Sequence, residues 1–215
     1  MSRSRENILS KLRSAQGTIS PHHVVEAHIP MVPLGDTSQE ALIERFMQQV
    51  EKLACVIYAV DSQEQALSTL LGLIGSDRSI LSWSLDAIPL AGLADALAAN
   101  GIEVASSRDA SVRIGLTGVD AALAATGSLV LSAAPGKHRV TSLLPPIHIA
   151  IVRRNQILAD LETWVARQRE QGIDRFRALS STMIISGPSR TADIAMELVM
   201  GMHGPREVHI VLVNS

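Results

Sequence analysis

The sequence predicts an α/β protein, namely a three-layer α/β/α sandwich around a mostly parallel sheet. Short apolar runs alternate with amphipathic segments over most of the 215-residue chain. The runs are apolar at almost every position rather than at every second one, which is typical of strands buried on both faces. Helical connections between such strands cover both faces of a parallel sheet, so the alternation favours this architecture.

The first 36 residues are expected to lie outside the main domain. Residues 4–15 place Ile8, Leu9 and Leu12 on one side of a helix and charged residues on the other. The segment that follows is rich in proline and glycine and predicts a loop. We therefore expect a helical arm and linker over residues 1–36 and a single α/β domain over residues 37–215.

Helix ends carry recognisable signals in the main domain. The run from Thr37 to Glu40 has the spacing of a capping box, and so has Ser62 with Gln65. Asn100-Gly101 and Gly172 are typical stops. We expect helices over residues 38–54, from Ser62 onwards, over 90–99, over 119–125 and over 161–171.

The strands are predicted from the remaining apolar runs. Most of these runs are four to seven residues long and are bounded by Gly, Pro, Asn or Ser. We expect strands over residues 55–60, 79–83, 102–105, 128–133, 147–152, 183–186 and 208–213, with a further extended segment over 112–118. No internal repeat is visible.

Composition excludes several classes of function. The formal net charge is −2 and acids and bases are interspersed, so no electrostatic footprint for nucleic acid or anionic lipid is present. Aromatic residues make up 2% of the chain, too few to build base-stacking platforms. No apolar stretch approaches the length of a membrane span, and the N-terminus lacks the apolar core of a leader peptide. A cytoplasmic protein is expected.

The single cysteine, Cys55, lies in an apolar run and is interpreted as a buried strand residue. One cysteine cannot form an intrachain disulfide or hold an iron–sulfur cluster. His22, His23 and His28 fall in the linker and are interpreted as surface residues, because a zinc site needs a fixed set of three or four ligands. We therefore expect neither a metal site nor a cofactor in this chain.

Ligands of open α/β sheets bind beyond the carboxyl ends of the strands, which directs attention to three loops. Glycine lets the main chain approach a ligand closely, hydroxyls donate hydrogen bonds, and arginine binds carboxylates or phosphates with two parallel bonds. The candidates are Thr126, Gly127 and Ser128 in the first loop, Arg139 and Ser142 in the second, and Gly187, Ser189, Thr191, Asp193 and His203 in the third.

Each loop also has a structural interpretation. Gly127 is a plausible helix C-cap, and the loop of Arg139 can be an ordinary solvated surface loop. The third loop precedes a segment that can begin a helix and would present main-chain N–H groups to an anion. A triad of Ser189, His203 and Asp193 is conceivable on residue types, but the Gly-x-Ser-x-Gly elbow is missing, so hydrolysis is not favoured.

Taken together, these loops resemble the LutC/YkgG family. The resemblance rests on GLTGVDAALAATGSLVL at 115–131, on Arg139 with SLLPPIHI at 142–149, and on GPSRTADI at 187–194 with HGP at 203–205. RENILSKL at 5–12 is also similar, so the likeness covers nearly the whole chain. It implies a LUD domain over residues 37–215, with a fold like that of the NagB/RpiA/CoA-transferase group.

The resemblance also implies a function. It suggests an accessory, non-redox subunit of a system that oxidises L-lactate to pyruvate together with iron–sulfur partner proteins. Family members commonly carry acids where this chain has Ala125 and Ala195, which counts against an autonomous enzyme. Such an enzyme, or a sensor without partners, acting on a phosphorylated, CoA-linked or carboxylate ligand, is the alternative.

Overall fold

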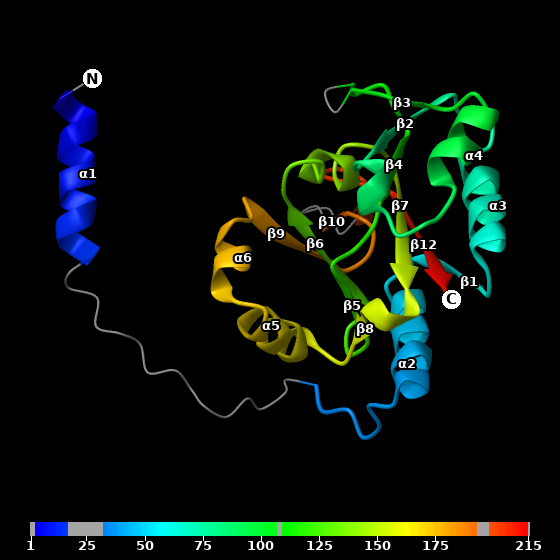
Figure 1. Ribbon diagram of the computed structural model, residues 1–215, viewed down its shortest axis with the longest axis horizontal. Helices are drawn as coiled ribbons and strands as arrows, with labels where there is room; N and C mark the ends of the chain where they lie inside the picture. The colour runs from blue at the N-terminus through cyan, green and yellow to red at the C-terminus, as the bar shows by residue number, and fades with distance from the viewer. Residues whose placement is uncertain (1–2, 17–31, 107–108, 193–197, 215) are drawn as a thin grey trace.

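The computed structural model describes residues 3–16, 32–106, 109–192 and 198–214 (Figure 1). The α-helices are α1 (Arg3–Gln16), α2 (Gln39–Lys52), α3 (Gln63–Ile74), α4 (Leu93–Ala99), α5 (Leu161–Glu170) and α6 (Ile173–Arg177), and the 3-10 turns are η1 (Leu85–Ala87), η2 (Arg139–Ser142) and η3 (Arg154–Gln156). The strands are β1 (Val56–Val60), β2 (Ser79–Ser82), β3 (Glu103–Val104), β4 (Ile114–Thr117), β5 (Ala121–Leu123), β6 (Ser128–Ala133), β7 (Ile147–Arg153), β8 (Ile157–Leu158), β9 (Ser181–Ile185), β10 (Arg190–Ala192), β11 (Leu198–Met200) and β12 (Glu207–Val213).

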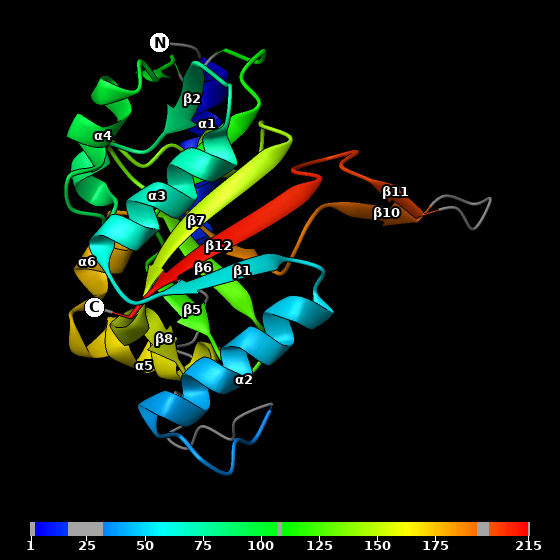
Figure 2. The same cartoon turned by 90° about the vertical axis from the view of Figure 1, so that its right-hand side faces the viewer.

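A six-stranded sheet forms the centre of the fold. Its order is β1-β12-β7-β4-β2-β3, and every neighbouring pair is parallel. Helices α3 and α4 cover one face of this sheet, whereas α2 and a second sheet lie against the other (Figures 1 and 2). The predicted α/β class with a mostly parallel central sheet is therefore confirmed.

The second sheet has four strands in the order β8-β5-β6-β9 and was not predicted. One of its faces packs against the central sheet through Leu129 and Leu131. The other face packs under α5, where Val130 and Leu158 contact Trp164. Because both faces of this sheet are buried, its strands are apolar at almost every position, as the strands of a parallel sheet are. Only β5 and β8 pair in parallel, whereas the β5–β6 and β6–β9 pairs are antiparallel.

The helix predicted over residues 119–125 is wrong. Ala121–Leu123 forms β5, which turns back through Thr126 and Gly127 and pairs antiparallel with β6. The alanine-rich sequence has helix propensity, but every residue of β5 is fully covered by the neighbouring layers, and tertiary burial outweighs local propensity. Gly127 is accordingly a hairpin-turn residue with a φ of 71°, not a helix cap.

Other predicted boundaries agree with the structure to within a few residues. Ser62 caps α3 by accepting a hydrogen bond from the Gln65 N–H at 3.2 Å. Helix α2 is capped by Ser38 rather than by Thr37, and α4 begins at Leu93, three residues later than predicted. The third loop leads into β10, which pairs with β11, and not into a helix.

Two further predictions concern the N-terminal helix and the single cysteine. Helix α1 is present over residues 3–16, as the amphipathic pattern predicted, and it lies away from the α/β body (Figure 1). Cys55 is buried, as predicted, but it lies one residue before β1 rather than in the strand. Among the described residues, no helix is long and apolar enough to cross a membrane.

Candidate functional site

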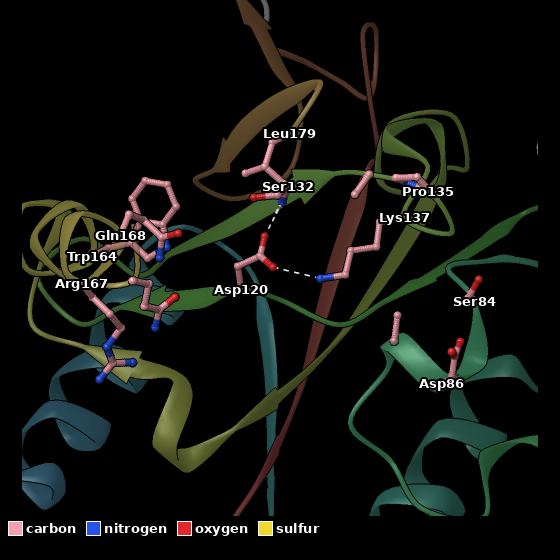
Figure 3. A pocket seen from close by; sticks show the side chains of 13 residues that line it. Ser84, Asp86, Asp120, Ser132, Pro135, Lys137, Trp164, Arg167, Gln168 and Leu179 are labelled. Carbon is pink, nitrogen blue, oxygen red and sulfur yellow. Dashed lines mark hydrogen bonds and ion pairs between the residues drawn. The ribbon is translucent and has the colours of Figure 1, made fainter. Parts of the chain in front are cut away.

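A pocket of about 420 Å³ opens beside the carboxyl ends of β2 and β4 (Figure 3). Residues that follow these two strands line one side of the pocket, residues of β6 and the loop after it line the second side, and α5 lines the third. We call it the Asp120 pocket. Its lining residues are Ser84, Asp86, Ala87, Asp120, Ser132, Ala134, Pro135, Lys137, Trp164, Arg167, Gln168, Gln171 and Leu179.

An ion pair crosses the Asp120 pocket. The Lys137 Nζ lies 3.0 Å from the Asp120 Oδ1, and the two side chains are only 26% and 23% exposed. The second carboxylate oxygen of Asp120 accepts a hydrogen bond from the Ser132 N–H (Figure 3). Partial burial strengthens such a pair relative to one in water. Asp120 is therefore held between the central sheet and β6.

The position of Lys137 is also determined by its neighbours. Its ammonium lies 4.9 Å from the centre of the Trp83 ring, within the range of a cation–π contact. The Ser84 N–H donates a 2.7 Å hydrogen bond to the Gly136 carbonyl and so holds the turn that precedes Lys137. Gly136 has a φ of 77°, and a Cβ on it would lie 2.5 Å from the Ser84 Oγ. The positive φ favours glycine in the turn that precedes Lys137.

Helix α5 brings further polar groups to the rim of the pocket. Asp160 caps the helix by accepting a 2.8 Å hydrogen bond from the Thr163 N–H, and Arg167 and Gln168 of the same helix line the pocket. The pocket thus combines the partly buried Asp120–Lys137 pair with the exposed Asp86 carboxylate, the Arg167 guanidinium, amides and hydroxyls. Groups of this kind can bind a small polar molecule that has both a hydroxyl and a carboxylate.

The first and third predicted loops meet at the C-terminal end of α2. A Cβ on Gly127 would lie 2.8 Å from the Val50 nitrogen, and a Cβ on Gly187 would lie 2.7 Å from the Leu53 carbonyl oxygen. The Arg190 guanidinium donates to that same Leu53 oxygen at 2.8 Å. Both glycines therefore allow close packing against α2, which is a structural reason for their presence.

Three hydroxyls form a chain where these loops meet, and we call them the hydroxyl cluster. The Ser128 Oγ lies 2.8 Å from the Thr126 Oγ1 and 2.7 Å from the Ser186 Oγ. The cluster lines a second pocket of about 420 Å³, in which five of the eleven lining residues are leucine, isoleucine or valine. Ala125, where the family resemblance suggests an acid, lines this pocket, and so do the carboxylates of Asp160 and Glu162.

Arg139 and Ser142, the two candidates of the second predicted loop, lie in different surroundings. Arg139 is exposed and lines a shallow depression with His138, Ser180 and Ser181, separate from the hydroxyl cluster. Ala134 and Lys137 also line this depression, so it adjoins the Asp120 pocket. Ser142 is buried, and its hydroxyl donates a 3.1 Å hydrogen bond to the Arg139 carbonyl within η2. Its role is therefore to close a turn.

Of the three residues of the conceivable triad, the structure describes Ser189 and His203. The Ser189 Oγ accepts a 3.3 Å hydrogen bond from the main-chain N–H of His203, whose side chain is exposed. Thr191 lies in β10 opposite Val199. Asp193 lies outside the described residues, as do the three linker histidines and Ala195.

Asp120 and Lys137 are the residues that sequence reasoning missed as a site. Asp120 lies three residues after the end of the buried strand β4, which is a signal of the kind that selects the other loops. The helix predicted over residues 119–125 hides this signal. Lys137 stands in a surface loop, and its partner lies 17 residues away in sequence, so no local motif joins the two.

Among the residues that the structure describes, no group of three His, Cys, Asp or Glu side chains is arranged to hold a metal ion. Burial raises the pKa of the Cys55 thiol to about 11, with Arg190 opposing the rise. The thiol is therefore protonated at neutral pH, and a protonated thiol is neither a good nucleophile nor a metal ligand.

The fold and the Asp120 pocket together define an open α/β protein with a ligand-sized pocket at the carboxyl edge of a parallel sheet. A family model described as the LUD domain matches residues 43–213, and the chain belongs to that family. The resemblance seen in the sequence is thereby confirmed.

Named relatives and a solved structure agree with this assignment. The chain is 29% identical to lactate utilization protein C of Shouchella clausii, over 97% of this chain and 94% of the relative. It is 29% identical to the protein of the same name from Halalkalibacterium halodurans, over 97% and 95%. A crystal structure of a DUF162 family protein from Deinococcus radiodurans has a TM-score of 0.60 at 20% identity, covering 84% of this chain and 99% of that one, which shows a shared fold.

Proposed function

We propose that this chain is an accessory, non-redox subunit of an L-lactate oxidation system in which iron–sulfur partner proteins carry the electrons. The observation that carries the proposal is the similarity, over nearly the whole chain, to proteins called lactate utilization protein C. Oxidation of L-lactate to pyruvate removes two electrons and two protons, so it requires an electron acceptor. The sequence has one cysteine, whereas an iron–sulfur cluster needs several thiolates.

The Asp120 pocket is where we expect the organic acid to bind. An ammonium has three N–H donors, so Lys137 can donate to a ligand carboxylate while it keeps its contact with Asp120. The Asp120 carboxylate can accept a hydrogen bond from a hydroxyl on the neighbouring carbon of the ligand. A 2-hydroxy acid offers both groups at adjacent carbons, which makes it complementary to this ion pair.

A binding measurement tests the pocket. We expect Lys137→Met to weaken binding of L-lactate to the purified full-length protein by roughly tenfold to a hundredfold in isothermal titration calorimetry, because a charged hydrogen bond is lost. Arg177→Met removes a cation that is 70% exposed on α6 and is expected to change nothing. Lys137 also lines the depression beside Arg139, so Arg139→Met separates the two sites: it is expected to bind L-lactate as the wild type does. A loss in Arg139→Met as large as that in Lys137→Met would place the ligand at the Arg139 loop and refute the Asp120 pocket.

A second experiment tests the partnership. The tagged protein is purified from its own cells grown on L-lactate, and the eluate is assayed for iron and for lactate oxidation. Recovery of iron-containing partners with lactate-oxidising activity supports the accessory-subunit proposal. A protein that elutes alone and iron-free refutes it, whatever the calorimetry shows.

The alternative is an autonomous enzyme or sensor for a larger ligand, and the size of the pocket favours it. A volume of about 420 Å³ lies in the range that holds drug-sized molecules and exceeds what a three-carbon acid fills. Tighter binding of a phosphorylated or CoA-linked compound than of L-lactate, by a protein that elutes alone, would support this second function.

A further inference from the structure

Strand β1 is covered far less than the neighbouring strands of the central sheet. All four residues of β4 are buried, and so are the middle residues of β7 and β12. None of the five residues of β1 is fully buried, and Val56 is 46% exposed. Strands of a parallel sheet are normally buried on both faces, so the exposure of β1 is unusual.

The two edges of the sheet are built differently. The edge strand β3 has only two residues, one of which is the charged Glu103. Short length and charge are the usual features that prevent an edge from pairing with another chain. Strand β1 has the sequence Val-Ile-Tyr-Ala-Val, with no charge and no proline. It therefore lacks the features that block edge-to-edge pairing.

The main chain of β1 is paired on one side. Its five residues align with His209 to Val213 of β12, and no other strand among the described residues pairs with it. Figure 2 shows the second side of β1 facing outward between α3 and α2. Main-chain N–H and C=O groups along such an edge are free to form a further ladder.

We propose that β1 pairs with β1 of a second copy of this chain, antiparallel about a twofold axis, and so extends the central sheet across a dimer. A second copy suits this edge because the strand is self-complementary. In a pair centred on Tyr58, the first residue of the strand lies opposite the last, so valine faces valine and no like charges meet. Twofold dimers with such self-complementary interfaces are the commonest oligomers.

A partly exposed patch beside the edge, in which Val56 is 46% exposed and the His209 side chain is 12% exposed, enlarges the contact. Val56 lies opposite His209, so Val56, Tyr58 and His209 point to the same face of the sheet. The Tyr58 and His209 rings are stacked with centroids 6.0 Å apart, and the Tyr58 Oη lies 3.4 Å from the His209 Nδ1. Antiparallel pairing about Tyr58 brings the two patches next to each other across the axis.

The oligomeric state of the full-length protein tests the proposal. We expect light scattering after size-exclusion chromatography to give twice the chain mass of 23.0 kDa. The double variant Val56→Lys/Ala59→Lys places cations along the edge at exposed positions and is expected to have the mass of one chain. Val104→Lys is the matched control, because Val104 lies on the opposite edge and is also 46% exposed. Circular dichroism confirms that each variant is folded.

Hydrogen exchange provides a second measurement. The β1 amides that point away from β12 are expected to exchange slowly in the wild-type dimer and at least about tenfold faster in the double variant, because that side of the strand becomes open to water. A wild-type protein that is monomeric at all concentrations overturns the proposal. A monomer whose outward-pointing β1 amides are protected shows that the chain's own residues cover the edge. Dissociation of Val104→Lys to the same extent shows that the loss of the dimer is not specific to β1. Either result also refutes the proposed dimer.

Discussion

Replacing Gly115 with alanine is expected to lower the free energy of unfolding by about 3 kcal/mol or more. Gly115 lies in β4, and a Cβ on it would be 1.9 Å from the Thr141 carbonyl oxygen and 3.1 Å from the Pro145 Cγ. The first contact is with main chain, which a side-chain rotation cannot relieve. Strand β4 and η2 would have to separate, and Lys137 lies on the loop that leads into η2.

Chemical denaturation measures this effect, and the chain offers a control of opposite sign. Gly72 lies within α3, and a Cβ there would meet nothing within 4 Å. Gly72→Ala is expected to raise the free energy of unfolding by about 0.5–1 kcal/mol, because alanine has the higher helix propensity. If Gly115→Ala is as stable as the wild type, η2 does not pack on β4 as closely as the structure describes.

Acidification is expected to destabilise the protein through His148. This side chain is fully buried, its Nε2 lies 2.8 Å from the Thr117 Oγ1, and its Nδ1 has no hydrogen-bond partner among the described residues. Burial lowers the pKa of His148 from 6.5 to about 4. The imidazole is therefore neutral in the folded protein and takes up a proton only when it reaches water.

The direction of the pH effect follows from proton binding. Between pH 6.5 and pH 4 the unfolded chain binds more protons at this histidine than the folded chain does, so stability falls as the pH falls through this window. The contribution of His148 to the free energy of unfolding is fully present above pH 6.5, the pKa of histidine in the unfolded chain. Its loss over the whole window is on the order of 3 kcal/mol.

Urea unfolding at about pH 7.5 and about pH 5 measures the loss, of which roughly 2 kcal/mol falls in this interval. His148→Gln removes the titrating group and is expected to reduce the difference between the two pH values by that amount, although the variant is less stable overall. The other six histidines are the same in both proteins, so they cancel in the comparison. An unchanged difference would show that His148 is accessible to protons in the folded state.

Local signals predicted much of the central sheet and most of its helices. Ser62 with Gln65 marks the start of α3, and the uninterrupted run over β7 marks a strand buried on both faces. These features depend on interactions within a few residues or on a local apolar pattern, so they can be identified in the sequence.

The second sheet and the site could not be predicted in the same way. Ala121–Leu123 is extended because β6 and β8 pair with it on either side, whereas its own sequence favours a helix. The Asp120 pocket depends on a contact between residues 17 positions apart, and the hydroxyl cluster depends on one between Ser128 and Ser186, 58 positions apart. Neither spacing belongs to a local motif.

The sequence by itself determined the α/β class, the cap of α3 and the lack of cluster thiolates in this chain, because composition and short-range patterns are sufficient for these conclusions. The family resemblance came from the particular residues of three loops. Only the tertiary structure decided which loops converge. It separated Arg139 from the hydroxyl cluster, turned Ser142 into a turn-closing residue and paired Asp120 with Lys137. Such contacts form between residues that are distant in the chain and that meet only when the layers pack. Their strength depends on how deeply the packed layers bury them and on the geometry between the layers, and neither is encoded in one short segment.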